Sequence, residues 1–477
     1  MLNTLIYIYG ILVFFYSMSL IIMYVMLIIN SFYQQDKANK WSKDYIKNMV
    51  DGSPFTPGVS IVAGAYNEEN TIVENVNSLL SQDYPKFEVV IVNDGSKDKT
   101  LEKMIEAFDL IEIPYDYIYK IYCKPFKRLF KSTNPKFDKL TVVDKVNGGT
   151  KADAINGGLN VAQYDYFINT DADCLLAKDA IYQCIFPILL DKDTIAVSGT
   201  MSMSNGFDID EDGNVVEYKP SKRLFPLFQD LEYKRSFLIG KMGWSNINAM
   251  PNVSGGYGLF NKDIVIAAGG YGYDSFAEDM DMLWRMIAYC CDFNKPYKVV
   301  QIPHTCCWTE GPATFRTLRR QRTRWGRGLI QLLLKHRHML FKPKYKQLGM
   351  ITFPYELLYE FLAPIIEAVG IFMIIYLIFT GGVNWNSFWI MFLAIYIFSV
   401  LLSGFVILYD YKHGGSYNKS RGYISLIMAA ILEPFLYHPL ITIFSLTGYW
   451  KHIKGEKLVW GDMQHKGHTN DTKTTNN

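Results

Sequence analysis

The sequence carries almost no excess of either charge, because its 48 Lys and Arg side chains nearly balance its 46 Asp and Glu side chains, for a formal net charge of +2. Without a strong positive field, the chain as a whole is not drawn to nucleic acid or to another polyanion. We therefore expect no nucleic-acid partner, and any electrostatic function must be local.

Cysteine is scarce, with seven residues in a chain of 477, and no two of them form a CxxC pair or follow a spacing typical of a structural metal site. They are therefore expected to be reduced thiols of a cytosolic region. The chain also lacks the GxxxxGK[ST] loop that binds phosphate, which argues against a nucleoside triphosphatase.

Long apolar runs, in contrast, are abundant. Residues 5–31 carry no charge over more than the roughly 20 residues that a bilayer core requires. Because this run lacks a basic leader and a small-residue cleavage site, we expect residues 1–32 to remain as an N-terminal transmembrane anchor. Four lysines in the following "QQDKANKWSKDYIK" predict that the next region is cytosolic.

Apolar runs return at about 357–380 and 386–409 and predict two further spans within a C-terminal transmembrane region at 350–450. Glu367 lies inside the first of these runs, where a charge is expensive in lipid. It should either face the interior of the helix bundle or reach from a helix end to the lipid headgroups.

The last apolar stretch, 422–449, is interrupted by "EPFLYHP", in which an acid and two prolines break the helical pattern. A single span would place the basic "KHIKGEK" outside the cell, against the positive-inside rule, whereas a re-entrant or interfacial segment would keep it inside. We favour the second alternative. The polar tail 463–477 is expected to be disordered. The chain as a whole is expected to be a multi-pass protein of the plasma membrane.

The middle of the chain, about 55–345, alternates short apolar runs with polar loops and helix-like segments. "VSIVAG" at 59–64 is typical of a buried strand and precedes the loop "AYNEEN", and "FEVVIVNDGSKDKT" repeats this plan. Such alternation predicts an α/β domain with a parallel sheet, in which ligands bind at the carboxyl ends of the strands.

A third predicted strand, 164–174, ends in Asp171 and Asp173. Carboxylates at alternate positions can aim their oxygens at one site, and two such ligands with room for water and phosphate suit Mg²⁺ or Mn²⁺ on a diphosphate. A DxD pattern alone is weak, since most acidic pairs on loops are merely solvated.

Two segments carry charge where a helix should begin. In "NGGTKADAINGGL" the glycines free the backbone before Lys151, which could meet an anion. In "SFAEDMDMLWRM" Glu278 and Asp279 open a predicted helix, where acids also favour the positive end of the helix dipole without any function. The run "RRQRTRWGRG" (319–328) lies in a segment, 316–340, whose composition predicts an amphipathic helix on the inner leaflet.

In their order along the chain, these segments resemble the family 2 glycosyltransferases with a GT-A fold, and among them the membrane-embedded processive synthases of poly-N-acetylglucosamine, cellulose and hyaluronan. The resemblance covers about 60–330. It rests on "AYNEE", "VNDGSKDKT", "TKADAINGGL", "TDADC", "VSGGYGLF", "FAEDMD" and "QRTRW". It implies an α/β, Rossmann-like GT-A domain in the cytosol, inserted between N-terminal and C-terminal transmembrane helices.

The resemblance also implies roles on the nucleotide side. Asp171 and Asp173 would lie by the ribose and the diphosphate, with Asp173 most directly on a divalent metal, Mg²⁺ or Mn²⁺. The residues implied to bind the uridine and the rest of the nucleotide are Tyr66, Glu68, Asp94 and Lys151.

On the acceptor side, the resemblance implies that Asp279 is the catalytic base and that Glu278 binds substrate beside it. Gln321, Arg324 and Trp325 match the pattern "QxxRW". The arginine would meet the departing diphosphate, and the tryptophan would stack on the acceptor sugar.

The implied activity is that of an inverting enzyme that polymerises units from a UDP-sugar, UDP-N-acetylglucosamine or UDP-glucose, onto a growing β-linked glycan and exports the product across the bilayer. A single transfer to a lipid-linked acceptor is the alternative, against which "QxxRW" argues. A silent scaffold, that is, a protein of this fold without catalytic activity, is disfavoured because every acidic motif is present.

The sequence departs from the family pattern at one position. Ala277 replaces the family's usual threonine, which puts the acceptor contact of that threonine in doubt. A small membrane partner subunit for export is a further candidate partner, although no sequence feature marks it.

Overall fold

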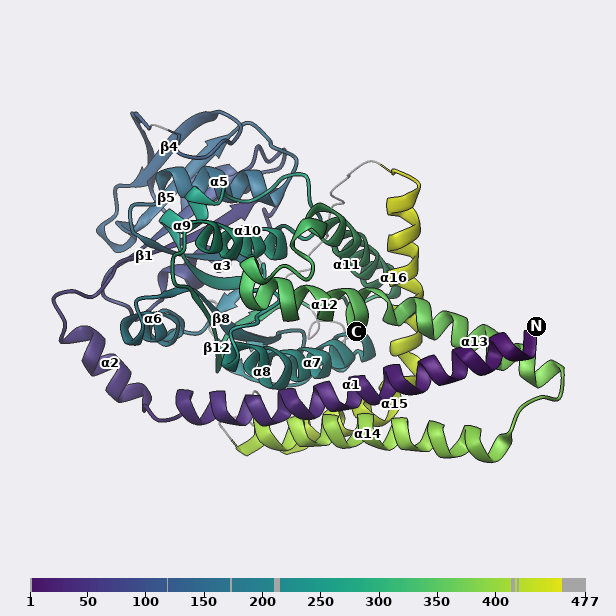
Figure 1. The fold of residues 1–477 in the computed structure, drawn as a ribbon. Coiled ribbons are helices and arrows are strands. Elements are labelled where there is room, and N and C mark those ends of the chain that lie inside the picture. Colours follow the sequence, from purple (N-terminus) through teal and green to yellow (C-terminus); the bar gives the residue numbers. More distant parts are fainter. Residues whose placement is uncertain are drawn as a thin grey trace, which may run out of the picture.

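The computed structural model describes residues 2–117, 119–171, 174–209, 215–412, 417 and 420–456. Figure 1 shows an α/β domain next to a group of long helices that includes α1, α13, α14 and α15. Two expectations concern residues outside the described ones: metal binding by Asp173 and disorder of the tail 463–477.

A mixed sheet forms the core of the α/β domain. Among the described residues, ten strands join it in the order β3-β4-β5-β2-β1-β6-β11-β8-β12-β7, and β9 and β10 form a separate pair. The strands are β1 (Val59–Ala65), β2 (Phe87–Asn93), β3 (Leu110–Ile113), β4 (Phe126–Ser132), β5 (Leu140–Lys145), β6 (Tyr166–Asp171), β7 (Leu175–Leu176), β8 (Thr194–Met203), β9 (Asp208–Ile209), β10 (Val215–Glu217), β11 (Tyr257–Asn261) and β12 (Lys298–Thr309).

The centre of this sheet is parallel, as the sequence predicted. β1 pairs in parallel with β2 and with β6, so the carboxyl ends of the three strands meet at one edge. Both faces of β1 and β2 are buried, which explains why their sequences are almost continuously apolar. The sheet as a whole is not parallel, because β3, β4 and β5 are joined without a crossover helix and therefore pair antiparallel.

Helices cover both faces of the sheet (Figure 1). In α5, a Cβ on Gly158 would lie 2.3 Å from Val62 Cγ1, so only glycine lets this helix approach the strands so closely. The helices of the domain are α2 (Lys43–Asp51), α3 (Ile72–Leu80), α4 (Thr100–Ala107), α5 (Lys151–Val161), α6 (Ala180–Leu190), α7 (Leu224–Arg235), the π-helix η2 (Ser236–Lys241), α8 (Met242–Asn246), α9 (Lys262–Ala267), α10 (Glu278–Asp292) and α11 (Phe315–Lys335).

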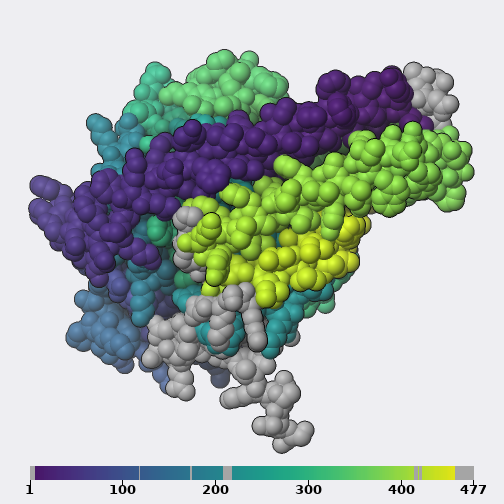
Figure 2. All heavy atoms as spheres, turned by 90° about the horizontal axis from the view of Figure 1, so that it is seen from below, coloured from purple at the N-terminus to yellow at the C-terminus, as the bar shows by residue number. Residues whose placement is uncertain are grey.

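Three helical stretches in the described part of the chain are long and apolar enough to cross a membrane: Ile6–Ala38, Leu348–Phe379 and Trp385–Lys412. The chain is therefore a membrane protein. α1 (Leu2–Ala38) and α14 (Trp385–Lys412) lie side by side in Figure 2, and the rings of Phe32 and Phe405 are 5.4 Å apart between them.

The second stretch begins at Leu348, earlier than the expected 357, because short helical pieces extend it toward the N-terminus. They place two acidic residues, Glu356 and Glu360, in the same continuous helix-like segment. Its parts are η5 (Leu348–Thr352), α12 (Phe353–Tyr355), the π-helix η6 (Glu356–Phe361) and α13 (Ala363–Phe379).

The last apolar stretch breaks at "EPFLYHP", as the sequence predicted. α15 (Ser420–Leu436) and α16 (His438–Ile453) meet at a bend of 51°, which fits either a broken span or a re-entrant loop. The preference for a re-entrant or interfacial segment therefore stays a prediction.

The arginine-rich helix α11 is more deeply packed than its composition predicted. A Cβ on Gly326 would lie 2.9 Å from the backbone oxygen of Ser445 in α16, so α11 and α16 are in direct contact. Arg322 and Arg327, which were expected on a face turned toward lipid headgroups, are 4% and 8% exposed. These two side chains point into the protein because they have partners there.

Candidate active site

One large cavity joins the α/β domain to the long helices. Its volume is about 2570 Å³, and its lining comes from the carboxyl ends of β1, β2 and β6, from the starts of α5 and α10, from α11 and from α1, α13, α14, α15 and α16. Ten residues singled out from the sequence line it: Tyr66, Glu68, Asp94, Lys151, Asp171, Glu278, Asp279, Gln321, Arg324 and Trp325. The structure brings these residues together, and their individual roles stay predictions.

The loops after β1 and β2 are tied to one another. The Asn67 N–H donates to Ser96 Oγ at 3.0 Å, and the Lys97 N–H donates to Asn67 Oδ1 at 2.8 Å. Asn67 has a φ of 57°, a left-handed conformation that asparagine adopts more readily than most residues. This turn presents Tyr66 and Glu68 to the cavity.

Asp94, directly after β2, is held from several sides. Lys145 is completely buried, and its Nζ donates to both Asp94 and Asp153. The Gly148 N–H donates to Asp94 Oδ1 at 3.0 Å. Because one buried ammonium serves two carboxylates, the orientation of the Asp94 side chain is fixed before any ligand binds.

The backbone of Gly255 links the acids at β6 and α10. Its carbonyl accepts from Lys151 Nζ at 2.6 Å, and its N–H donates to Asp279 Oδ2 at 2.9 Å. Lys151 also donates to Asp171. Although burial acts to lower it, the charges of Asp171 and Glu278 raise the pKa of Lys151. This lysine is therefore a cation within a chain of hydrogen bonds that runs from Asp171 to Asp279.

Glu278, at the N-terminus of α10, is surrounded by charge. Burial raises the pKa of its carboxyl to about 7, Asp279 acts in the same direction, and Arg324 and Lys151 act against it. The side chains from α5, α10 and α11 therefore influence one another electrostatically across the cavity. A carboxyl that titrates near neutrality in a cavity is typical of a functional site.

The raised pKa predicts how the Glu278→Gln variant should respond to pH. The pKa of this acid is raised in the folded state, from 4.5 to about 7. Such an acid stabilises the fold at a pH below the pKa of the unfolded state, and this contribution is lost as the pH rises through 7. Its full size is on the order of 3 kcal/mol. Since glutamine cannot ionise, we expect the thermal midpoint of the purified variant to fall less than that of the wild type between about pH 5 and pH 8. Parallel curves would contradict the assigned shift.

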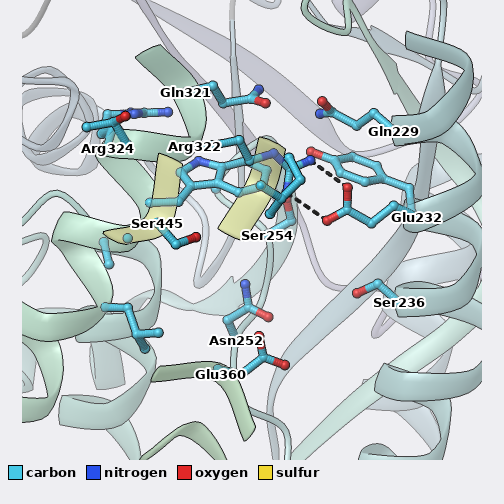
Figure 3. A pocket seen from close by; sticks show the side chains of 18 of the residues that line it. Gln229, Glu232, Ser236, Asn252, Ser254, Gln321, Arg322, Arg324, Glu360 and Ser445 are labelled. Atoms are coloured by element: carbon cyan, nitrogen blue, oxygen red, sulfur yellow. Dashed lines mark hydrogen bonds and ion pairs between the residues drawn. The ribbon is translucent and has the colours of Figure 1, made fainter. Parts of the chain in front are cut away.

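Arg322 connects three helical segments on the α11 side of the cavity. Its guanidinium donates to the two Glu232 oxygens at 2.7 and 2.6 Å, shown as dashed lines in Figure 3, and to Tyr437 Oη at 2.8 Å. Its Cζ lies 4.4 Å from the centre of the Trp325 ring. Arg322 therefore supports the ring of Trp325 and connects α7, α11 and the bend between α15 and α16.

α11 also lies directly against the segment before the expected base. A Cβ on Gly328 would lie 2.9 Å from the Ala277 nitrogen and 3.0 Å from the Ala277 Cβ. The Phe276 N–H donates to Gln331 Oε1 at 3.2 Å. Ala277, where the family usually has threonine, therefore packs against a glycine, and the segment that leads into Asp279 contacts the "QxxRW" helix directly.

Several of these contacts have no clear signal in the sequence. Arg322 is one of five arginines in ten residues, and nothing in that run shows which arginine is buried. Lys145 lies outside the quoted motifs. Gly255 and Asp153 do lie within motifs, "VSGGYGLF" and "TKADAINGGL". Their positions in these motifs were the only sequence signal that could have indicated their contacts in the site.

Asp171 fits a divalent cation that is also held by the phosphates of a ligand. Its side chain is 40% exposed and lines the cavity. One oxygen accepts from Lys151, and the other has no partner among the described residues. Carboxylate oxygens are the ligands that Mg²⁺ and Mn²⁺ prefer. Within the described ranges there is no group of three or more His, Cys, Asp and Glu side chains that could hold a metal by itself.

Two family models match the chain: "Glycosyl transferase family 2" over residues 60–246 and "Glycosyl transferase family group 2" over residues 216–407. Poly-beta-1,6-N-acetyl-D-glucosamine synthase of Staphylococcus epidermidis is 28% identical over 354 residues, which are 72% of this chain and 74% of that protein. The enzyme of the same name from Staphylococcus aureus (strain MSSA476) is 28% identical over 298 residues, 62% of this chain and 60% of that protein.

A solved structure has the same fold over nearly the whole chain. It is the mannosyltransferase PcManGT from Pyrobaculum calidifontis in complex with GDP-Man and Mn²⁺, with a TM-score of 0.51, 17% identity, and coverage of 93% of this chain and 99% of that one. The α/β domain thus has the GT-A fold that the motifs implied. Because the two family models together span the sheet, the cavity loops, α10 and α11, the chain is an enzyme of glycosyltransferase family 2.

Proposed function

We propose that this glycosyltransferase is an inverting polysaccharide synthase, which transfers sugar units from UDP-N-acetylglucosamine or UDP-glucose to a growing β-linked glycan. The observation that carries the proposal is the continuity of one cavity, from Asp94 and Asp279 in the α/β domain to Glu367 and Tyr396 on the long apolar helices. The relatives named as poly-beta-1,6-N-acetyl-D-glucosamine synthases make UDP-N-acetylglucosamine the first donor to test.

Asp279 is the proposed base. Its carboxylate takes the proton of an acceptor hydroxyl, whose oxygen forms a bond to the anomeric carbon of the donor while the bond from that carbon to the diphosphate breaks and UDP leaves with the electron pair. Attack from the side opposite the diphosphate inverts the configuration, so an α-linked donor gives a β-linked product. Arg324 and Lys151 line the same cavity and would balance the negative charge on the departing UDP.

The nucleotide is proposed to bind at the carboxyl edge of the sheet. Asp171, with Asp173, would hold Mg²⁺ or Mn²⁺ there. Such an ion would neutralise charge on the diphosphate and make UDP a better leaving group. The residues proposed to hold the uridine are Tyr66, Glu68 and Asp94.

The acceptor is proposed to bind along α11. The ring of Trp325 offers an apolar face on which a sugar can stack. Gln321 Oε1 is buried without a hydrogen-bond partner among the described residues, so it can accept from a sugar hydroxyl. Both residues line the cavity.

The part of the cavity between the long helices contains polar groups, which supports export of the product. Glu367 faces the interior of the bundle, the first of its two expected positions, and accepts hydrogen bonds from His438 Nε2 at 3.0 Å and Thr442 Oγ1 at 2.6 Å. All three line the cavity. A hydrophilic chain can cross lipid only where such groups replace water. We therefore propose a multi-pass plasma-membrane protein with its catalytic domain, about 55–345, in the cytosol.

The proposal is tested with membranes that contain the protein, Mg²⁺ or Mn²⁺, and radiolabelled UDP-N-acetylglucosamine or UDP-glucose in separate reactions. We expect label from one donor in high-mass product that a β-specific glycosidase degrades. Label only in short, lipid-extractable product would instead identify a single-transfer enzyme. No incorporation from either donor would contradict the proposed donors.

A further inference from the structure

Two π-helices meet at the cavity. η2 ends at Lys241 and η6 begins at Glu356. The ring of Trp244, just after η2, lies 4.8 Å from the ring of Tyr355, just before η6, so the two segments pack against each other. π-Helical turns inside α-helices are uncommon and occur frequently at functional sites. Lys241 and Glu356 both line the cavity.

These two side chains, a lysine and a glutamate, are buried, yet they are not paired. Each is 5% exposed. Within the described ranges, neither forms a hydrogen bond or an ion pair, and the Lys241 ammonium only lies 4.3 Å from the centre of the Phe237 ring. Burying a charge without a hydrogen-bonding partner is strongly unfavourable, so a ligand that satisfies both groups would remove this penalty.

The ammonium lies within electrostatic reach of the proposed base. Burial lowers the pKa of Lys241 to about 8, and the charges of Asp279 and Glu356 act against that change. Lys241 is therefore protonated at neutral pH and faces the part of the cavity in which an acceptor hydroxyl must meet Asp279.

Further polar groups surround this part of the cavity. Figure 3 shows the side chains of Ser236, Asn252 and Glu360 pointing into it. Ser236 begins the π-helix that ends at Lys241, and Glu360 lies one turn after Glu356. Hydroxyl, amide and carboxylate groups together are typical of a sugar subsite and not of an apolar pocket.

We propose that Lys241 and Glu356 form a clamp that binds the terminal sugar of the glycan acceptor and selects a neutral sugar. Lys241 donates to an oxygen of the sugar, and the Glu356 carboxyl forms a hydrogen bond with a hydroxyl or an amide of the sugar. Because the Lys241 ammonium faces the sugar, an uncharged residue fits better than an amino sugar, whose own ammonium it repels. This inference rests on the proposed function, since it assumes a glycan acceptor in the cavity.

The experiment compares Lys241→Met, Glu356→Gln and the wild type in two trisaccharide titrations, one of β-linked N-acetylglucosamine and one of β-linked glucosamine, in slightly acidic buffer that protonates the amines. We expect each variant to bind the N-acetylglucosamine trisaccharide about tenfold more weakly than the wild type, the loss expected for one buried hydrogen bond. Lys241→Met removes the ammonium that repels an amine, so its preference should shift toward the cationic trisaccharide. Glu356→Gln leaves that ammonium in place, so its preference between the two trisaccharides should stay that of the wild type.

A shift in preference in one variant and not in the other cannot arise from general damage to the fold. Two exposed residues of the sheet supply matched controls, Lys298→Met and Glu112→Gln, which should behave like the wild type. UDP binding should stay within about twofold in all four variants. Unchanged trisaccharide binding in both clamp variants, or loss of UDP and trisaccharide binding together, would overturn the clamp. A wild type that binds the N-acetylglucosamine trisaccharide but transfers no sugar would contradict the proposed function and leave the clamp supported.

Discussion

Asp279→Asn should lose sugar transfer by about a thousandfold, the usual contribution of a general base, while the protein still binds UDP. Asparagine keeps an oxygen that can accept the Gly255 N–H, now at 2.9 Å from Asp279 Oδ2, so the chain of contacts to Lys151 should survive. Only the ability to take a proton is lost. The measurement is the initial rate of label transfer from the UDP-sugar, together with the dissociation constant of UDP by calorimetry.

Asp274→Asn supplies the matched control, because this residue precedes the same helix but its side chain is 64% exposed and pairs with Lys335 at the surface. It should keep the rate of the wild type. If Asp279→Asn retained most of the rate and Glu278→Gln lost it, the base would be Glu278. If Asp279→Asn lost UDP affinity to the same extent as rate, Asp279 would be a residue for nucleotide binding.

The positions of the acidic residues could be predicted from the sequence, because they follow strands that physical chemistry places side by side. Asp94 and Asp171 come directly after or at the end of apolar runs, and the carboxyl ends of parallel strands meet at one edge of a sheet. Which cation meets each acid could not be predicted. Lys145 reaches Asp94 from 51 residues away, and this pairing depends on the register of β2 against β5.

The α11 side of the cavity was less predictable because it depends on contacts between distant helices. "QxxRW" indicated Arg324 and Trp325, but the burial of Arg322 requires Glu232 on α7 and Tyr437 at the bend before α16. Lys241 belongs to no motif, and its burial depends on the packing of η2 against α1 and α7. Local periodicity contains no information on such contacts.

The second large effect is expected for Arg324→Ala, which should lower kcat by about a hundredfold to a thousandfold with a smaller change in KM for the UDP-sugar. Arg324 lines the cavity and acts on the pKa of Glu278 from α11, so its charge lies close to the reacting groups. The negative charge on the diphosphate grows as the bond to the sugar breaks, and a guanidinium stabilises that state more than the bound donor. Arg324→Lys keeps the charge but loses the planar fork that matches phosphate oxygens. We therefore expect it to recover only part of the rate.

Steady-state kinetics with the UDP-sugar would check this order, wild type above Arg324→Lys above Arg324→Ala, with Arg337→Ala as a control just beyond the end of α11. A second readout follows from electrostatics. Arg324 acts to lower the pKa of Glu278, so its removal should raise that pKa, and the pH range in which Glu278 stabilises the fold should extend upward. An effect confined to KM, with kcat unchanged, would show instead that Arg324 binds the donor equally in the ground and transition states. Loss of rate without any change in the pH dependence of stability would separate Arg324 from Glu278 and contradict their proximity in the cavity.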